Sequence, residues 1–95
     1  MNQNQRVIKN YQENEKMMIL LYAQWCRNND LSAIELYEKA YPNQPKDLLL
    51  EMMGWTMPKE EAEPISNETL ISALQAFGND DLAFVVYEQQ ERQKK

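Results

Sequence analysis

The sequence predicts an all-α fold, a compact bundle of about five short helices. Glycine and proline are absent between Met1 and Tyr41, and apolar residues recur at three- and four-residue spacing through most of the chain. The glycines and prolines after Tyr41 divide the remainder into short segments. A chain of 95 residues is long enough for one core and too short for two, so a single helical domain over 1–95 is expected.

The first predicted helix centres on residues 13–27, with a backward extension through residues 7–11 as an alternative. Apolar side chains cover almost its whole circumference, which is typical of a central helix. Residues 1–10 are expected to be frayed. The apolar positions of this helix are Met17, Met18, Ile19, Leu20, Leu21, Tyr22, Trp25 and Cys26.

The second helix is predicted over Leu31–Tyr41, with the Asp30 side chain as its N-cap and Pro42 as its stop. A polar turn at residues 27–30 joins it to the first helix. Because this turn is short, the first two helices are expected to form an antiparallel helical hairpin.

One local spacing resembles a tetratricopeptide repeat. The resemblance covers about a third of the chain and implies that two antiparallel helices pack closely. Leu21 and Gln24 depart from the pattern, and no second copy follows, so a solenoid is not predicted. The matching positions are Met17, Leu20, Ala33, Tyr37, Ala40 and Pro45.

A third, short helix is predicted with Pro45 in its first turn, and Gly54 is expected to end it in the left-handed conformation. Residues 55–65 contain two prolines and three glutamates. We expect this stretch to be a connector, with one helical turn after Pro58.

Two helices are predicted after the connector. Ser66 is a suitable N-cap for the first of them, and Gly78 is suited to end it. Residues 79–80 are expected to cap the last helix, which becomes polar towards a solvated, frayed tail at 89–95. Residues 82–87 are also rich in strand-forming side chains, but the chain offers no second strand to pair with them, so a helix is favoured.

The residue types argue against catalysis. The chain contains no histidine, one cysteine (Cys26) and two glycines, so an ordinary zinc site, a histidine base and a phosphate-binding glycine loop are excluded. The carboxylates at 60–63 and at 80–81 are interpreted as solvated or capping charges. We therefore expect no enzyme activity, no cofactor and no metal.

The charge balance makes nucleic acid an unfavourable partner. Ten basic and fifteen acidic residues give a net charge of −5, which repels phosphate backbones and anionic membranes. The N-terminus lacks the apolar stretch of a secretion signal, and the longest apolar run, Met17–Ala23, is too short to span a membrane. Since a single cysteine also fits a reducing compartment, a cytoplasmic location without membrane attachment is expected.

Met53, Trp55 and Met57 concentrate large, adaptable side chains beside a helix break. We therefore predict that they bind a partner, either another protein or a second copy in a homodimer. Chain length favours the alternative that these three residues cover the open end of a small core, because so short a chain needs most of its apolar groups to fold.

The leading functional hypothesis is a small acidic, non-catalytic protein-interaction module that acts as an adaptor, inhibitor or regulator. One alternative is a nucleic-acid-binding regulator of the helix-turn-helix kind, in which residues 31–41 would be the recognition helix. Glu35 and Glu38 on that helix would repel phosphate. A second alternative is an acidic inhibitor of a nucleic-acid enzyme.

Overall fold

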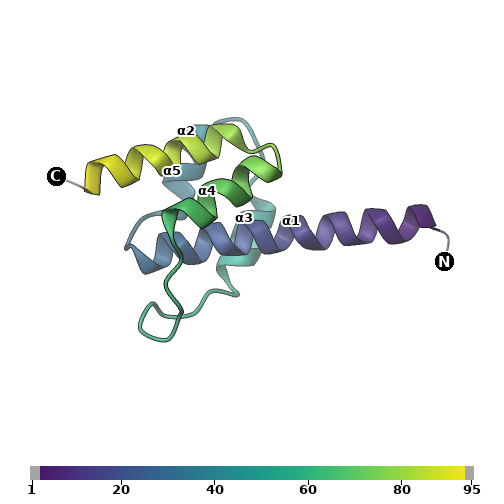
Figure 1. Cartoon of the computed structure of the whole chain (residues 1–95), viewed down its shortest axis with the longest axis horizontal. Coiled ribbons are helices and arrows are strands. Elements are labelled where there is room, and N and C mark those ends of the chain that lie inside the picture. Colours follow the sequence, from purple (N-terminus) through teal and green to yellow (C-terminus); the bar gives the residue numbers. More distant parts are fainter. Residues whose placement is uncertain (1–2, 94–95) are drawn as a thin grey trace.

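The computed structural model describes the backbone of residues 3–93 and the side chains of residues 15–92. No strand occurs in this range, so residues 82–87 are helical as favoured. The predicted all-α bundle of five helices is confirmed. In chain order the helices are α1 (Gln3–Asn28), α2 (Ala33–Ala40), α3 (Asp47–Met53), α4 (Asn67–Ala76) and α5 (Asp80–Gln93) (Figure 1).

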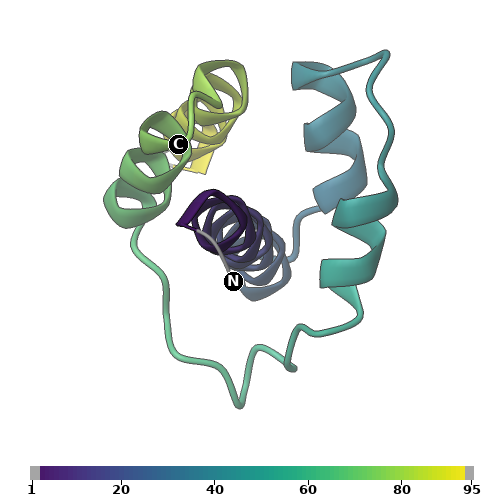
Figure 2. The same ribbon diagram turned by 90° about the vertical axis from the view of Figure 1, so that its right-hand side faces the viewer.

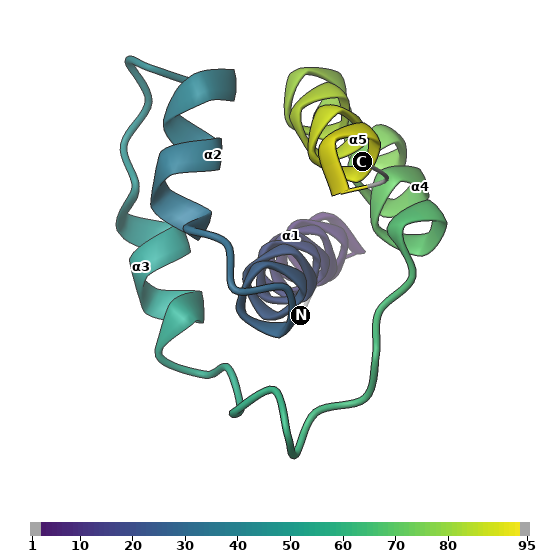
Figure 3. The same cartoon turned by 90° about the vertical axis from the view of Figure 1, so that its left-hand side faces the viewer.

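α1 is the central helix of the bundle. When the molecule is viewed along α1, helices α2 and α3 lie on one side of it and α4 and α5 on the other (Figures 2 and 3). The segment between α3 and α4 passes around the remaining side of α1 (Figure 3). The most extensive pairings are α4 with α5 and α1 with α3. The N-terminal part of α1 extends beyond the other helices (Figure 1).

All five helices contribute to one apolar core. Its largest side chain, Trp25, is fully buried and donates from Nε1 to the Asn67 side-chain oxygen at 2.7 Å. The buried Tyr22 hydroxyl donates to the Ala33 carbonyl at 2.7 Å. Because both polar tips are bonded, burying these aromatic side chains leaves no polar group without a partner.

The predicted antiparallel packing of the first two helices is not what the structure has. In the view along α1, α2 is seen from its side, so the two helices cross steeply instead of running along each other (Figures 2 and 3). α2 is short, and it makes more of its contacts with α5 than with α1. Its buried residues are Ala33 and Leu36, and the helix packs against both α5 and α1.

Asp30 is not the N-cap of α2, contrary to the prediction. Its φ of 57° is left-handed, and the next amide, that of Leu31, donates to the Cys26 carbonyl at 2.8 Å. This pattern ends α1. The N-cap is Ser32, whose Oγ accepts from the Glu35 amide at 3.2 Å, so α2 begins two residues later than predicted.

The ends of α3 also differ from the prediction. Gly54 has a φ of −67°, which is right-handed, and its amide donates to the Glu51 carbonyl at 3.2 Å. The chain therefore leaves α3 through a tight turn that needs no left-handed residue. Pro45 lies before the helix and not in its first turn, which begins at Asp47.

Both predicted signals of α4 are confirmed. The Ser66 hydroxyl oxygen accepts from the Thr69 amide at 3.1 Å, which makes Ser66 the N-cap. Gly78 has a φ of 76°, and the following Asn79 amide donates to the Leu74 carbonyl at 2.8 Å. This left-handed glycine ends the helix as expected.

Both terminal helices reach further than the sequence indicated. α1 begins at Gln3 and α5 continues to Gln93, so helical backbone covers most of the ranges expected to be frayed. These ranges are rich in glutamine, arginine and lysine, which have good helix propensity. The remainder of both ranges, 1–2 and 94–95, lies outside the described residues.

Candidate functional site

The connector between α3 and α4 is irregular in backbone but attached to α1 by side chains. The amide of Gln24 makes two bonds to the backbone of Met57: its Nε2 donates to the carbonyl at 2.9 Å and its Oε1 accepts from the amide at 2.8 Å. One side chain thereby satisfies both backbone groups of a residue outside any helix. The position of Met57 against α1 is fixed by this pair.

Two further α1 side chains bond to the connector backbone. Arg27 Nη1 donates to the Thr56 carbonyl at 3.1 Å and to the Thr56 hydroxyl at 2.9 Å. Asn28 Nδ2 donates to the Glu63 carbonyl at 3.3 Å. The connector is therefore held at both of its ends by one face of α1.

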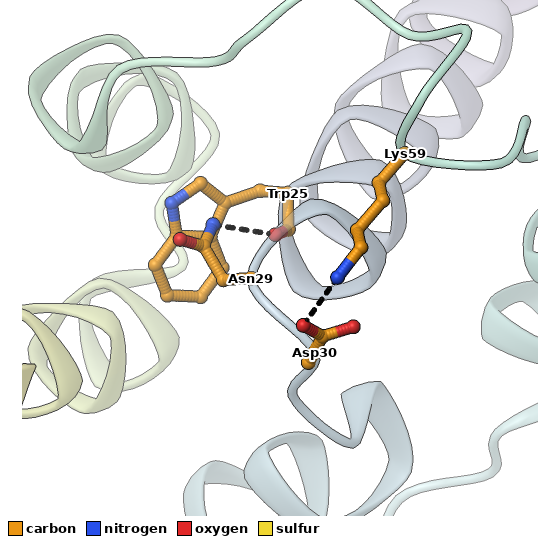
Figure 4. Close-up of polar contacts among 4 residues, drawn as sticks. All are labelled: Trp25, Asn29, Asp30 and Lys59. Carbon is orange, nitrogen blue, oxygen red and sulfur yellow. Dashed lines mark hydrogen bonds and ion pairs between the residues drawn. The ribbon is translucent and has the colours of Figure 1, made fainter.

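An ion pair links the connector to the C-terminal end of α1. Lys59 Nζ lies 2.6 Å from Asp30 Oδ2 (Figure 4), and this hydrogen bond raises the pKa of Lys59. In the same view Asn29 Nδ2 donates to the Trp25 carbonyl at 2.8 Å (Figure 4). Because the ion pair is exposed, it should add little to stability, and we interpret its role as positioning the connector at the end of α1.

A hollow of about 320 Å³ lies between α1 and the connector. We call it the α1–connector groove. Trp55 is 71% exposed and Met57 48% exposed at its edge. A second hollow of about 470 Å³, towards α4, adjoins it and shares Met17 and Leu21. The groove is lined by Met17, Leu20, Leu21, Gln24, Trp55, Met57 and Ile65.

Gln24 is the one polar residue that lines the groove. Both of its amide atoms bond to Met57, and its Nε2 also donates to Asn28 Oδ1 at 2.9 Å. The amide protons are therefore used within the protein. What the groove offers to an occupant is therefore an apolar surface.

The structure brings together two of the three predicted partner-binding residues. Trp55 and Met57 share the groove, and their exposure contradicts the alternative that they cover the core. Met53, in contrast, is half-buried against the core, as that alternative predicts. It lines a different hollow of about 290 Å³, together with Cys26.

The thiol of Cys26 beside Met53 is not arranged for chemistry. Its side chain is buried, and burial raises its pKa to about 12, with an opposing contribution from a hydrogen bond to Tyr22. A thiol with so high a pKa stays protonated near neutral pH. We therefore interpret the hollow of about 290 Å³ beside Cys26 as imperfect packing at the surface of the core.

The sequence reasoning missed the α1 half of the groove. Met17 is exposed, and Leu20, Leu21 and Ile65 are half-buried. The available signal was the apolar circumference of the first helix, which exceeds what one core can cover. From that pattern the sequence predicts a central helix, but not which of its apolar side chains stay exposed.

A separate pair of exposed aromatic residues lies on α5 and was also not predicted. Phe84 is 62% exposed, and Tyr87 is exposed three residues further along the helix. We call this pair the α5 surface. The hollows beside it are lined partly by charged residues, including Asp81 and Glu88. It therefore differs from the groove in offering no continuous apolar lining.

No group of three or more cysteine, aspartate or glutamate residues in the described part of the chain is placed to hold a metal ion. No described helix has the length and apolar character needed to cross a bilayer.

The fold and the groove define a small all-α protein with an apolar surface site beside an attached connector. The chain belongs to the YxiS family, which it matches over residues 1–91. It is 49% identical over 80 residues to the uncharacterized protein YxiS of Bacillus subtilis (strain 168), a match that covers 82% of this chain and 83% of that protein. No solved structure matches it.

Proposed function

We propose that this protein is a small, non-catalytic interaction module that binds another protein through the α1–connector groove and so acts as an adaptor, inhibitor or regulator. One observation carries the proposal. Trp55 and Met57 are exposed around an apolar hollow, and two hydrogen bonds with the Gln24 side chain hold the backbone of Met57 there.

Physical chemistry favours such a surface for binding. Tryptophan and methionine are enriched in protein interfaces, and tryptophan is the side chain most often found at their energetic centres. Burial of exposed Trp55 and Met57 in a partner would release ordered water. Because Gln24 already fixes the backbone of Met57, binding would order little additional chain.

The non-catalytic part of the proposal rests on the sequence, which has no histidine, and on the burial of Cys26. The proposed cytoplasmic location rests on this single free cysteine. Neither depends on the identity of the partner.

The proposal is tested by co-purification from the native host with quantitative mass spectrometry. The variant Trp55→Ser/Met57→Ser removes the exposed side chains and keeps the Met57 backbone groups that bond to Gln24. The matched control, Phe84→Ser/Tyr87→Ser, removes a similar exposed pair from the α5 surface. Circular dichroism establishes that both variants remain folded.

The expected result is one protein that co-purifies with the wild type and with the α5 control but is lost with the groove variant. A partner lost only with the α5 control would move the interaction site to α5. If no protein depends on either surface, the interaction proposal is wrong.

A further inference from the structure

The α1–connector groove selects an occupant with apolar side chains. Its lining residues are Met, Leu, Ile and Trp except for Gln24, and the Gln24 amide is bonded to Met57 and Asn28. A polar occupant would lose water without gaining a partner here. Apolar side chains would gain contact at no such cost.

The connector places negative charge beside this apolar lining. Glu60 follows the lining residue Met57 by three positions, and Glu63 precedes the lining residue Ile65 by two. Glu60, Glu61 and Glu63 are all exposed. None of the three takes part in a salt bridge among the described residues.

Positive charge on this side is smaller than the negative charge of the three glutamates. Lys59 is paired with Asp30 at 2.6 Å, and Arg27, which donates to the neutral Thr56, keeps a single positive charge. Lys16, next to Met17 in the sequence, lies 4.0 Å from Glu51. The charge that remains available to a partner beside the groove is therefore negative, which favours a basic partner.

The form of the occupant follows from the surroundings of the groove. The described residues contain no strand, so they offer no sheet edge to which an extended peptide could add. The lining is aliphatic apart from Trp55, unlike the aromatic grooves that hold polyproline segments. Methionine-rich apolar grooves are instead suited to the apolar face of an amphipathic helix.

We propose that the groove binds a basic amphipathic helix of another protein, with the apolar face of that helix in the groove and its lysine or arginine residues facing Glu60, Glu61 and Glu63. This inference rests on the proposed function and names its partner class.

The test selects binders from displayed helical peptides of 16 residues. Each peptide keeps leucine or phenylalanine at helical spacing and varies its other positions among lysine, arginine, glutamate, glutamine and serine. The full-length protein is the bait, and the groove variant Trp55→Ser/Met57→Ser is the counter-selection. Affinities of the selected peptides are then measured by fluorescence anisotropy at two salt concentrations.

The expected peptides are net basic. Their affinity should fall at least about 30-fold in the groove variant, as is usual when central interface residues are removed. In Glu60→Gln/Glu61→Gln/Glu63→Gln the affinity should fall about fivefold at low salt and depend less on salt. The matched control is Glu35→Gln/Glu38→Gln/Glu88→Gln, which changes the net charge by the same amount as the connector variant. Its substitutions lie on α2 and α5, across α1 from the connector (Figure 3), so it should bind as the wild type does.

Neutral or acidic peptides, equal binding to the groove variant, or no enrichment would overturn the inference. Self-association of the protein that disappears in the groove variant would overturn it too, because a second copy would then be the occupant. The proposed function fails separately. A host protein that requires Trp55 and Met57 but is unaffected by the loss of Glu60, Glu61 and Glu63 preserves that function and rejects the basic helix.

Discussion

Two sides of α1 differ in what their side chains do. On the core side, Tyr22, Trp25 and Cys26 are buried among all the other helices. On the connector side, Met17 is exposed, while Gln24 bonds to the backbone of a segment that has no regular structure. The same helix thus builds the core with one side and supports an exposed surface with the other.

This difference separates stability from recognition. Burial of large apolar groups supplies most folding free energy, so the core side should dominate stability. The connector side contributes hydrogen bonds near the surface, which hold the Thr56 and Met57 backbone against α1 but add less free energy. Substitutions on the two sides should therefore have effects of different size.

Replacement of Trp25 by alanine should have the largest effect. It leaves a cavity in the core and removes the donor to Asn67, so we expect the free energy of unfolding to fall by about 3–5 kcal/mol. Urea titration followed by circular dichroism measures the change. The matched control Trp55→Ala should cost less than about 1 kcal/mol, and equal losses would show that the two sides do not differ.

Cys26 should give the core side a signature at alkaline pH. Burial raises its pKa from the ordinary value of 9.0 to about 12, so the thiol ionises more readily in the unfolded chain. Its contribution to stability is therefore complete below pH 9 and is lost as pH rises towards 12. The loss from this one group should be about 1.4 kcal/mol for each pH unit within that window.

The Cys26→Ala variant isolates this contribution. Burial also raises the pKa of Tyr22 above its ordinary value of 10.0, so the variant should lose stability only from about pH 10 upward. Urea titrations at pH 8, 9 and 10 compare the two proteins. If the free energy of unfolding changes with pH in the same way in wild type and variant, the Cys26 thiol does not resist ionisation in the folded state.

Gln24→Ala should have a smaller effect that is localised to the connector. The variant loses both bonds to the Met57 backbone, for an expected cost of about 1–2 kcal/mol. The amide of Met57, which donates to Gln24, should then exchange its hydrogen with solvent at least about tenfold faster. Gln75→Ala, an exposed glutamine on α4, is the matched control and should change neither quantity. Unchanged exchange at Met57 would contradict the attachment of the connector.

The sequence was informative where one local pattern decides the structure. Spacing of apolar residues predicted the helices, and Ser66 and Gly78 marked the ends of α4 because each has one suitable role there. The prediction for Asp30 is wrong because aspartate suits both an N-cap and a left-handed helix end. Only the contacts of the neighbouring residues distinguish these two roles.

The groove was less predictable because it depends on contacts between distant residues. Met57 meets Gln24, and Ile65 joins α1 residues in the groove, only when the connector lies against the central helix. The composition at residues 53–57 indicated a surface of interest but could not separate Met53, which packs on the core, from Trp55 and Met57. The chain turns out of α3 between these residues, at Gly54, which is right-handed and not left-handed as expected.

Replacement of the exposed pair should have the smallest effect on stability and therefore tests the comparison most directly. In Trp55→Ser/Met57→Ser the lost side chains are exposed, Trp55 mostly and Met57 by about half, and the Met57 backbone keeps its bonds to Gln24. We expect the free energy of unfolding to change by less than about 1 kcal/mol, with Met57 amide exchange as slow as in the wild type. A loss of about 3 kcal/mol or more would show that these side chains cover the core after all. The connector side would then serve stability, and the interaction surface would have to be sought on α5.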